Sequence, residues 1–213
     1  CAGLIHDIRN PPFGHFGELA IRDWFVRKLP ELHYKRQTLD MILSPQMKED
    51  FYHFEGNTQA LRVVTKLHFL VDEHGMNLTK ALLASIIKYP GSSLEVDKHS
   101  GNIKTKKMGY FYADREAFDD IQASCGTNGA RHPLAFILEA ADDIAYATAD
   151  IEDAVKKNCL TFEQLVRELT EYKKESQNER YRDMVSWLTD KYNRAVSKGY
   201  SRPDLYAVQN WVV

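Results

Sequence analysis

The run from His132 to Asp153 constrains the fold more than any other stretch, because its apolar residues recur with a period of about 3.6 residues. Pro133 suits the first turn of a helix, where the amide that proline lacks would have no partner. Alanines along the run allow neighbouring backbones to approach closely. The pattern predicts one long helix that is buried among its neighbours.

The remaining periodic segments are also helical. Pro30 ends the first of them, and Asn57, Thr79 and Thr161 precede later ones as helix caps. Polar stretches between them are expected to form loops, with one short helical piece between Glu31 and Asp50. We therefore expect an all-α protein built as a helical bundle. The predicted helices cover residues 18–29, 60–67, 80–87, 114–121, 162–169 and 180–196.

Composition bounds the class of protein. The chain has 213 residues, of which 44% are hydrophobic and 27% charged, enough for a real core. A formal net charge of -2 argues against non-specific electrostatic binding of nucleic acid, and we expect nucleic acid only as a secondary ligand. Three cysteines without C-x-x-C spacing suggest neither a disulfide scaffold nor a zinc knuckle. No apolar run approaches the roughly 20 residues that span a bilayer, and no signal peptide is present, so we expect a cytoplasmic protein without membrane contact.

The two ends of the chain are unusual for a complete protein. There is no initiator methionine, and Cys1 to Ile5 reads as the middle of a buried helix. The last residues stop without a polar tail. We expect a fragment of a larger helical protein, lacking its N-terminal part.

The segment from His6 to Glu18 concentrates groups that hold metals or move protons. His6 and Asp7 are adjacent and differ in direction by about 100° on a helix, yet both can reach one ion that sits between them. Two prolines then form an elbow, and His15 and Glu18 follow three residues apart, on one face of a new helix. A histidine oriented by a carboxylate is typical of a general acid or base.

Asp142 lies in the middle of the long predicted helix, where a buried carboxylate needs a cation or hydrogen-bond donors. Asp142, Tyr146 and Asp150 are spaced by four and share one face, which indicates a stripe of residues facing a ligand. Asp143 is the alternative to Asp142 and points about 100° away.

Several other polar residues have two interpretations by chemistry alone. His53 can be a structural, hydrogen-bonded histidine, and Lys88 can be a solvated helix end or the partner of a bound anion. Lys107 belongs to a lysine cluster that could simply be solvated. Together with the metal-type and acid–base groups, these residues favour metal-assisted attack of water on a phosphate ester.

Five ordered strings sharpen this interpretation: HDIRNPPFGHFGE, HFEGNTQ, KYP, KMGYF and EAADDIAY. They resemble the HD-domain deoxyguanosine triphosphate triphosphohydrolases and related dNTPases. The resemblance implies hydrolysis of a dNTP, with dGTP the expected substrate, to the deoxynucleoside and inorganic triphosphate, in a homo-oligomer. It also implies an HD core over residues 1–160, incomplete at its N-terminus. Residues 161–213 carry no motif, and we expect them to form a helical extension that packs on the core or on a neighbouring subunit.

The resemblance assigns roles residue by residue. The metal ligands would be His6, Asp7 and Asp142, holding Mg²⁺, Mn²⁺ or Co²⁺, and the acid–base pair would be His15 and Glu18. Tyr146 and Asp150 would bind the deoxyribose. The other substrate-binding residues would be His53, Asn57, Lys88, Tyr89 and Lys107.

Two departures keep alternatives open. Arg9 replaces the family's glycine and could narrow the pocket, contact phosphate or lower activity. The family also has a metal-binding histidine on an earlier helix, which this sequence does not contain. A different HD-type phosphohydrolase, acting on a monophosphate or cyclic nucleotide, and a non-catalytic nucleotide-binding module are therefore the alternatives.

The missing histidine yields a prediction. This chain should bind divalent metal more weakly than a chain that carries the upstream helix, because its ligand set would be incomplete. Calorimetric titration of both chains measures the difference, and equal affinities would overturn the idea.

Overall fold

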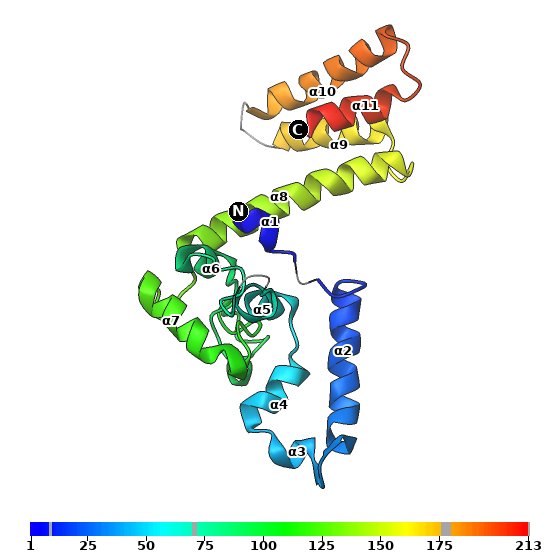
Figure 1. Ribbon diagram of the computed structural model, residues 1–213. Helices are drawn as coiled ribbons and strands as arrows, with labels where there is room; N and C mark the ends of the chain where they lie inside the picture. Colours follow the sequence, from blue (N-terminus) through cyan, green and yellow to red (C-terminus); the bar gives the residue numbers. More distant parts are fainter. Residues whose placement is uncertain (9, 70–71, 176–179, 213) are drawn as a thin grey trace. The chain divides into compact units, whose positions relative to one another are not determined.

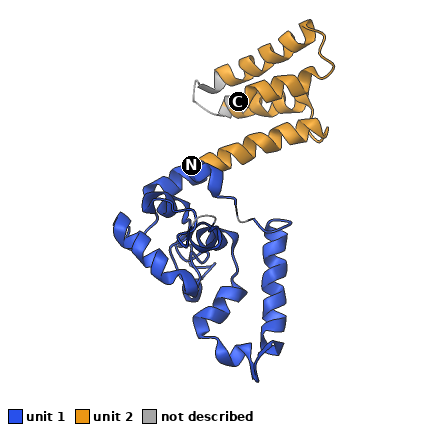
Figure 2. Ribbon diagram, viewed as in Figure 1, with its two compact units in different colours: residues 1–140 blue, residues 141–213 orange. Residues whose placement is uncertain are grey.

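A computed structural model describes residues 1–8, 10–69, 72–175 and 180–212 (Figure 1). By its internal contacts the chain divides into two compact units, Cys1–Ala140 and Ala141–Val213 (Figure 2). The division falls inside one helix and does not test the expected limit of the HD core at residue 160, which stays a prediction.

Helices dominate both units, so the all-α prediction is confirmed. Within the described residues the strands are β1 (His33–Tyr34) and β2 (Gln37–Thr38), which form one short antiparallel pair. The first unit contains α1 (Ala2–Ile5), α2 (His15–Lys28), α3 (Leu39–Ile42), α4 (Pro45–Tyr52), α5 (Gly56–Arg62), α6 (Lys80–Ile86), α7 (Arg115–Cys125) and the beginning of α8 (Pro133–Lys156).

The start of α2 shows how closely the proline elbow fits against a helix. A Cβ added at Gly17 would overlap the carbonyl oxygen of Pro12, so glycine is needed for this approach. At its other end α2 stops at Lys28 and tightens into a 3-10 turn over Leu29–Glu31, which contains Pro30. The predicted end of this helix is confirmed.

Two sequence predictions between α2 and α6 were wrong. The stretch expected to be a loop with one short helix contains the β1–β2 hairpin and both α3 and α4. Asn57 does not cap α5, which begins one residue earlier, at Gly56. The amide of Gly56 donates instead to the carboxylate of Glu18 on α2, at 2.8 Å. A carboxylate from another helix thus satisfies this helix start, a contact that the local sequence does not reveal.

The core of the first unit lies among α5, α6 and α7. Its buried side chains come from these helices, from the π turn over Val63–Leu67, and from Ile87 and Tyr110. Ala2 and Ile5 of α1 and Leu138 of α8 pack against its edge, so the core fixes both of these short stretches. The buried members are Ala60, Leu61, Val64, Leu83, Ala84, Ile86, Ile87, Tyr110, Phe118 and Ile121.

The second unit has a core of its own. It contains the rest of α8 together with α9 (Phe162–Glu175), α10 (Arg180–Ser197) and α11 (Pro203–Trp211). Thr161 caps α9, as predicted: its hydroxyl accepts from the amide of Gln164, and the side chain of Gln164 accepts from the amide of Thr161. The buried core residues are Val155, Phe162, Leu165, Leu188, Ala207 and Val208.

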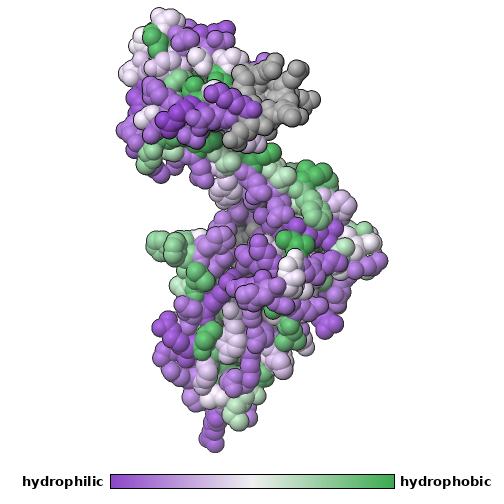
Figure 3. All heavy atoms as spheres, turned by 180° about the vertical axis from the view of Figure 1, so that it is seen from behind, coloured by the Kyte–Doolittle hydropathy of each residue, from purple (hydrophilic) through white to green (hydrophobic). Residues whose placement is uncertain are grey.

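The helix α8 has the predicted start and length but not the predicted burial. Phe136, Ile137 and Ile144 are exposed, and only Ala135 and Val155 are buried among its described residues. Figure 3 shows apolar residues scattered among hydrophilic ones over one face of the molecule. Alanine-rich helical periodicity therefore predicted the helix correctly and its environment incorrectly.

Among the described residues, no helix combines the length and the apolar character that crossing a bilayer requires.

The cap of α9 yields a prediction. Thr161→Ala should lower the free energy of unfolding by about 1 kcal/mol, because the amide of Gln164 loses its acceptor. Thr170→Ala on the same helix is the control, since the Thr170 hydroxyl donates to the carbonyl of Val166, which lies within the helix. Urea unfolding of both variants measures the difference, and an equal loss in both would contradict the capping role.

Candidate functional site

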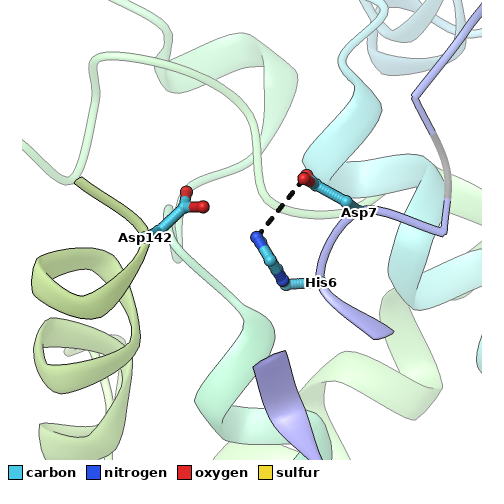
Figure 4. A group of neighbouring side chains, drawn as sticks. All are labelled: His6, Asp7 and Asp142. Carbon is cyan, nitrogen blue, oxygen red and sulfur yellow. Dashed lines mark ion pairs between the residues drawn. The ribbon is translucent and has the colours of Figure 1, made fainter. Parts of the chain in front are cut away.

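His6 ends α1 and is oriented by its own helix. Its Nδ1 lies 2.9 Å from the carbonyl oxygen of Gly3, and a carbonyl can only accept, so Nδ1 carries a proton. In the neutral ring the lone pair is then on Nε2, which faces Oδ2 of Asp7 at 3.4 Å (Figure 4). Two hydrogen-bond acceptors at this separation repel each other unless a proton or a cation lies between them.

Asp142 completes a three-residue group with these two side chains. Ligand atoms of His6, Asp7 and Asp142 all lie within 4.8 Å of one another. A cation about 2.0–2.4 Å from each ligand needs ligand atoms no more than about 4–5 Å apart, so the three can share one ion. The donor set, one imidazole and two carboxylates, suits a divalent metal. Asp143, the alternative from the sequence, is not in this group.

The start of α8 explains where Asp142 points. Leu138 packs against the first unit's core, and Glu139 accepts a 2.6 Å hydrogen bond from the buried Arg131. Asp142 follows one turn later on the same unbroken helix, on the face that carries these two residues. The packing of Leu138 and the Arg131–Glu139 ion pair therefore orient the turn of α8 that carries the Asp142 carboxylate.

His15 and Glu18 form the pair that their spacing predicts. Nδ1 of His15 lies 3.0 Å from Oε2 of Glu18 at the start of α2. The two side chains differ in environment, because that of His15 is 84% exposed and that of Glu18 only 6%. A buried carboxylate thus orients an imidazole whose other nitrogen can reach solvent or a ligand.

The pKa of Glu18 reflects this setting. Burial alone would raise the pKa of the carboxyl, but the hydrogen bonds from His15 and from the amide of Gly56, with the charge of Lys107, outweigh it. The pKa of Glu18 is therefore held below its ordinary value, and Glu18 is ionised at neutral pH.

Glu55 is a candidate site residue that the sequence did not single out. Its side chain is 1% exposed, and its two oxygens accept from Arg22 at 2.8 Å, from Lys107 at 2.8 Å and from Asn57 at 3.0 Å. Glu55 lies within the HFEGN string, so the resemblance indicated this part of the chain. Its neighbouring residues, however, do not reveal that the Glu55 carboxylate joins Arg22, Lys107 and Asn57.

A small pocket lies beside Glu55. It has a volume of about 170 Å³ and brings together cations from three parts of the first unit. The pocket contains four cationic side chains, one histidine and one carboxylate, and so is suited to an anion. Its residues are Arg22, His53, Glu55, Val96, Lys98, Lys106, Lys107 and Met108.

The structure places Tyr89 under Lys107. The Lys107 ammonium lies 5.9 Å from the centre of the Tyr89 ring, which is buried. Burial is the main reason that the pKa of the Tyr89 hydroxyl is raised. A Cβ at Gly109 would overlap the carbonyl of Tyr89, so glycine allows the two segments to approach this closely. Lys88 is half-buried next to Tyr89.

The other predicted site residues are less closely joined. His53 ends α4 and pairs with Glu49 on its own helix, with Nδ1 3.1 Å from a carboxylate oxygen. Tyr146 and Asp150 are exposed on α8, in the second unit, and their deoxyribose role stays a prediction. Arg9 lies outside the described residues, so its three interpretations also stay open.

The helical fold and the histidine–carboxylate group define the class: an all-α protein with a candidate metal centre. Comparison with known proteins identifies the family. The chain is 47% identical over 212 residues to the deoxyguanosinetriphosphate triphosphohydrolase-like protein of Listeria monocytogenes, covering 100% of this chain and 44% of that relative. It is 46% identical over 171 residues to the probable deoxyguanosinetriphosphate triphosphohydrolase of Pseudomonas aeruginosa, covering 77% of this chain and 33% of that relative.

A third relative is the deoxyguanosinetriphosphate triphosphohydrolase of Serratia proteamaculans, 39% identical over 192 residues, with 80% of this chain and 37% of the relative covered. The chain belongs to the family of deoxyguanosinetriphosphate triphosphohydrolases and similar proteins, and the resemblance seen in the sequence is confirmed. The chain spans less than half the length of these relatives. No protein-family model matches it.

Glu18 yields a prediction about acid stability. Because the folded-state pKa of Glu18 is below 4.5, its ionised form contributes stability above that pH, and this is lost as the pH falls through the folded-state pKa. Below pH 4.5 the free energy of unfolding should fall more steeply in the wild type than in Glu18→Gln. Urea unfolding between about pH 6 and about pH 3 measures both slopes. Glu163→Gln, an exposed change, should follow the wild type, and a Glu18→Gln curve parallel to it would refute the assignment.

Proposed function

We propose that this chain carries the hydrolytic centre of a dNTP triphosphohydrolase. The reaction is metal-dependent hydrolysis of deoxynucleoside triphosphates to the deoxynucleoside and inorganic triphosphate, and dGTP is the proposed substrate. The observation that carries the proposal is the meeting of His6, Asp7 and Asp142 within 4.8 Å, although Asp142 is far from the other two in sequence. The relatives' names, which specify deoxyguanosinetriphosphate triphosphohydrolase, support the choice of substrate.

The metal would be held by His6, Asp7 and Asp142, which fit it in donor type and in spacing. When bound, a divalent ion such as Mg²⁺, Mn²⁺ or Co²⁺ polarises a phosphoryl oxygen and lowers the pKa of water. The protein's own contribution begins with the Gly3 carbonyl, which keeps the proton on Nδ1 of His6 and so presents Nε2 as the ligand atom.

His15 is the proposed general acid or base, and Glu18 orients it. Glu18 is ionised and accepts from Nδ1, so Nε2 of His15 can take a proton from water or return one to the leaving oxygen. The exposure of His15 leaves it accessible to a substrate, while the burial of Glu18 fixes the direction of the ring.

The phosphate chain is proposed to lie against the cations of the pocket beside Glu55. Lys107 is its central member, and Lys88, Tyr89, His53 and Asn57 complete the proposed substrate-binding groups. An ammonium that is partly withdrawn from water attracts phosphate more strongly than a fully solvated one. Tyr146 and Asp150 would bind the deoxyribose, with Asp150 accepting from the 3'-hydroxyl.

Product analysis decides among the candidate functions. Release of inorganic triphosphate from a dNTP supports the proposal, whereas orthophosphate from a monophosphate or a cyclic nucleotide would point to another phosphohydrolase. Binding of nucleotide without turnover would indicate a non-catalytic module. A homo-oligomer in the cytoplasm is part of the proposal, and size-exclusion chromatography with light scattering tests the assembly.

A pair of neighbouring aspartates tests the metal centre. Asp142→Asn should weaken Mn²⁺ binding by about tenfold or more and abolish triphosphate release, because it removes a charged ligand from the three-residue group. Asp143→Asn changes the same functional group at the next position on α8 and should leave both unchanged. Calorimetry measures the binding and direct detection of triphosphate measures the reaction. Equal effects of the two changes would exclude this metal centre.

His15→Ala separates chemistry from metal binding. This variant should lose triphosphate release, since no imidazole remains to transfer the proton, and should bind Mn²⁺ as the wild type does, because His15 is not in the metal group. Retained turnover would rule out the proposed acid–base role.

A further inference from the structure

Glu55 is a buried carboxylate that three donors from different segments share. Arg22 comes from α2, Lys107 from the loop before α7, and Asn57 from α5. A carboxylate that is 1% exposed is stable only while such partners compensate its charge. Glu55 in turn holds the ammonium of Lys107, whose side chain is 25% exposed, 2.8 Å from one of its oxygens.

Glu55 also links the proposed phosphate-binding groups to the proposed acid–base pair. Arg22 donates to Oε2 of Glu55 at 2.8 Å and stands 3.8 Å from Oε2 of Glu18. The next residue, Gly56, donates its amide to Glu18 at 2.8 Å. Glu55 thus holds Arg22 at a distance from Glu18, where a closer guanidinium would compete with His15 for the same oxygen.

We propose that Glu55 is a positioning residue for the phosphate-binding groups of this site. It orients Lys107 and Asn57, keeps Arg22 from displacing His15 on Glu18, and offsets part of the positive charge of the pocket. The inference rests on the proposed function and adds a residue that acts through its neighbours and does not touch the substrate.

The two effects of Glu55 have opposite consequences for an anion, which makes the proposal testable. Removing its charge makes the pocket more positive, so inorganic triphosphate should bind more tightly. Weakening the hydrogen bonds of Glu55 misplaces Lys107, Asn57 and Arg22. A misplacement of about 1 Å can lower a rate on the order of a hundredfold. Glu55→Gln should therefore lower kcat about tenfold or more and tighten the binding of inorganic triphosphate about threefold.

Asp114 provides a matched control. It is also 1% exposed and also pairs with two cations, Arg62 at 3.0 Å and Lys66 at 2.9 Å; within the described part of the chain, these pairs involve none of the groups around Glu55. Asp114→Asn should destabilise the fold through the same loss of a buried charge. It should leave kcat per folded molecule and triphosphate affinity unchanged.

A second variant covers the case in which Glu55→Gln does not fold. Glu55→Asp keeps the charge but withdraws the carboxylate by one methylene, so kcat should fall while triphosphate affinity stays as in the wild type. Calorimetry with inorganic triphosphate measures the affinity, steady-state kinetics with dGTP measures kcat and KM, and circular dichroism measures the folded fraction.

The outcomes are distinct. Wild-type kcat in both Glu55 variants, or equal losses in Asp114→Asn, would overturn the positioning role. If the wild type has no turnover, the proposed function fails. The inference then depends on affinity alone: tighter triphosphate binding in Glu55→Gln but not in Asp114→Asn supports it, and unchanged binding overturns it.

Discussion

The ionised carboxylate of Glu18 is the contact on which the site of the first unit depends. It is buried in α2, accepts from His15 on one side and from the amide of Gly56 on the other, and so joins the start of α2 to the start of α5. Because α5 begins at this contact, the carboxylate also places Glu55 and Asn57, which stand on either side of Gly56. A change at Glu18 would disturb the proposed acid–base pair and the proposed phosphate-binding groups at once.

Arginine and lysine side chains around the two buried glutamates balance their charge. Arg22 lies between Glu18 and Glu55, and Lys107 pairs with Glu55 while its charge also lowers the pKa of Glu18. Each carboxylate would be costly by itself, and each cation would be mobile without it. Together the four groups join Lys107, in the stretch between α6 and α7, to α2 and to the start of α5.

The candidate metal-binding group of His6, Asp7 and Asp142 is held by other contacts. His6 is held by its own helix and by the packing of Ala2 and Ile5 on the core. Asp142 is held through the first turns of α8, where Leu138 packs on that core and Arg131 pairs with Glu139. The α1 residues next to His6, and Leu138 one turn before Asp142, thus pack on the same hydrophobic core.

Much of this could be predicted from local patterns. The end of α2 at Pro30, the cap of α9 at Thr161 and the extent of α8 follow from rules that act within a few residues. The same is true of the His15–Glu18 pair, since residues three apart on a helix share a face. Two of the expectations that were wrong, the Asn57 cap and the burial of α8, depend on partners from elsewhere in the chain.

Local patterns along the chain specify the long helices, the chemistry of the candidate ligands and, through five ordered strings, the family. The fold brings Glu55 to Arg22, Lys107 and Asn57, sets the Glu18 carboxylate against the first amide of α5, and groups Asp142 rather than Asp143 with His6 and Asp7. These contacts are not local because a buried charge selects its partners by proximity in space. Proximity between residues 18 and 56, or 55 and 107, is set by how helices pack and leaves no periodic trace along the chain.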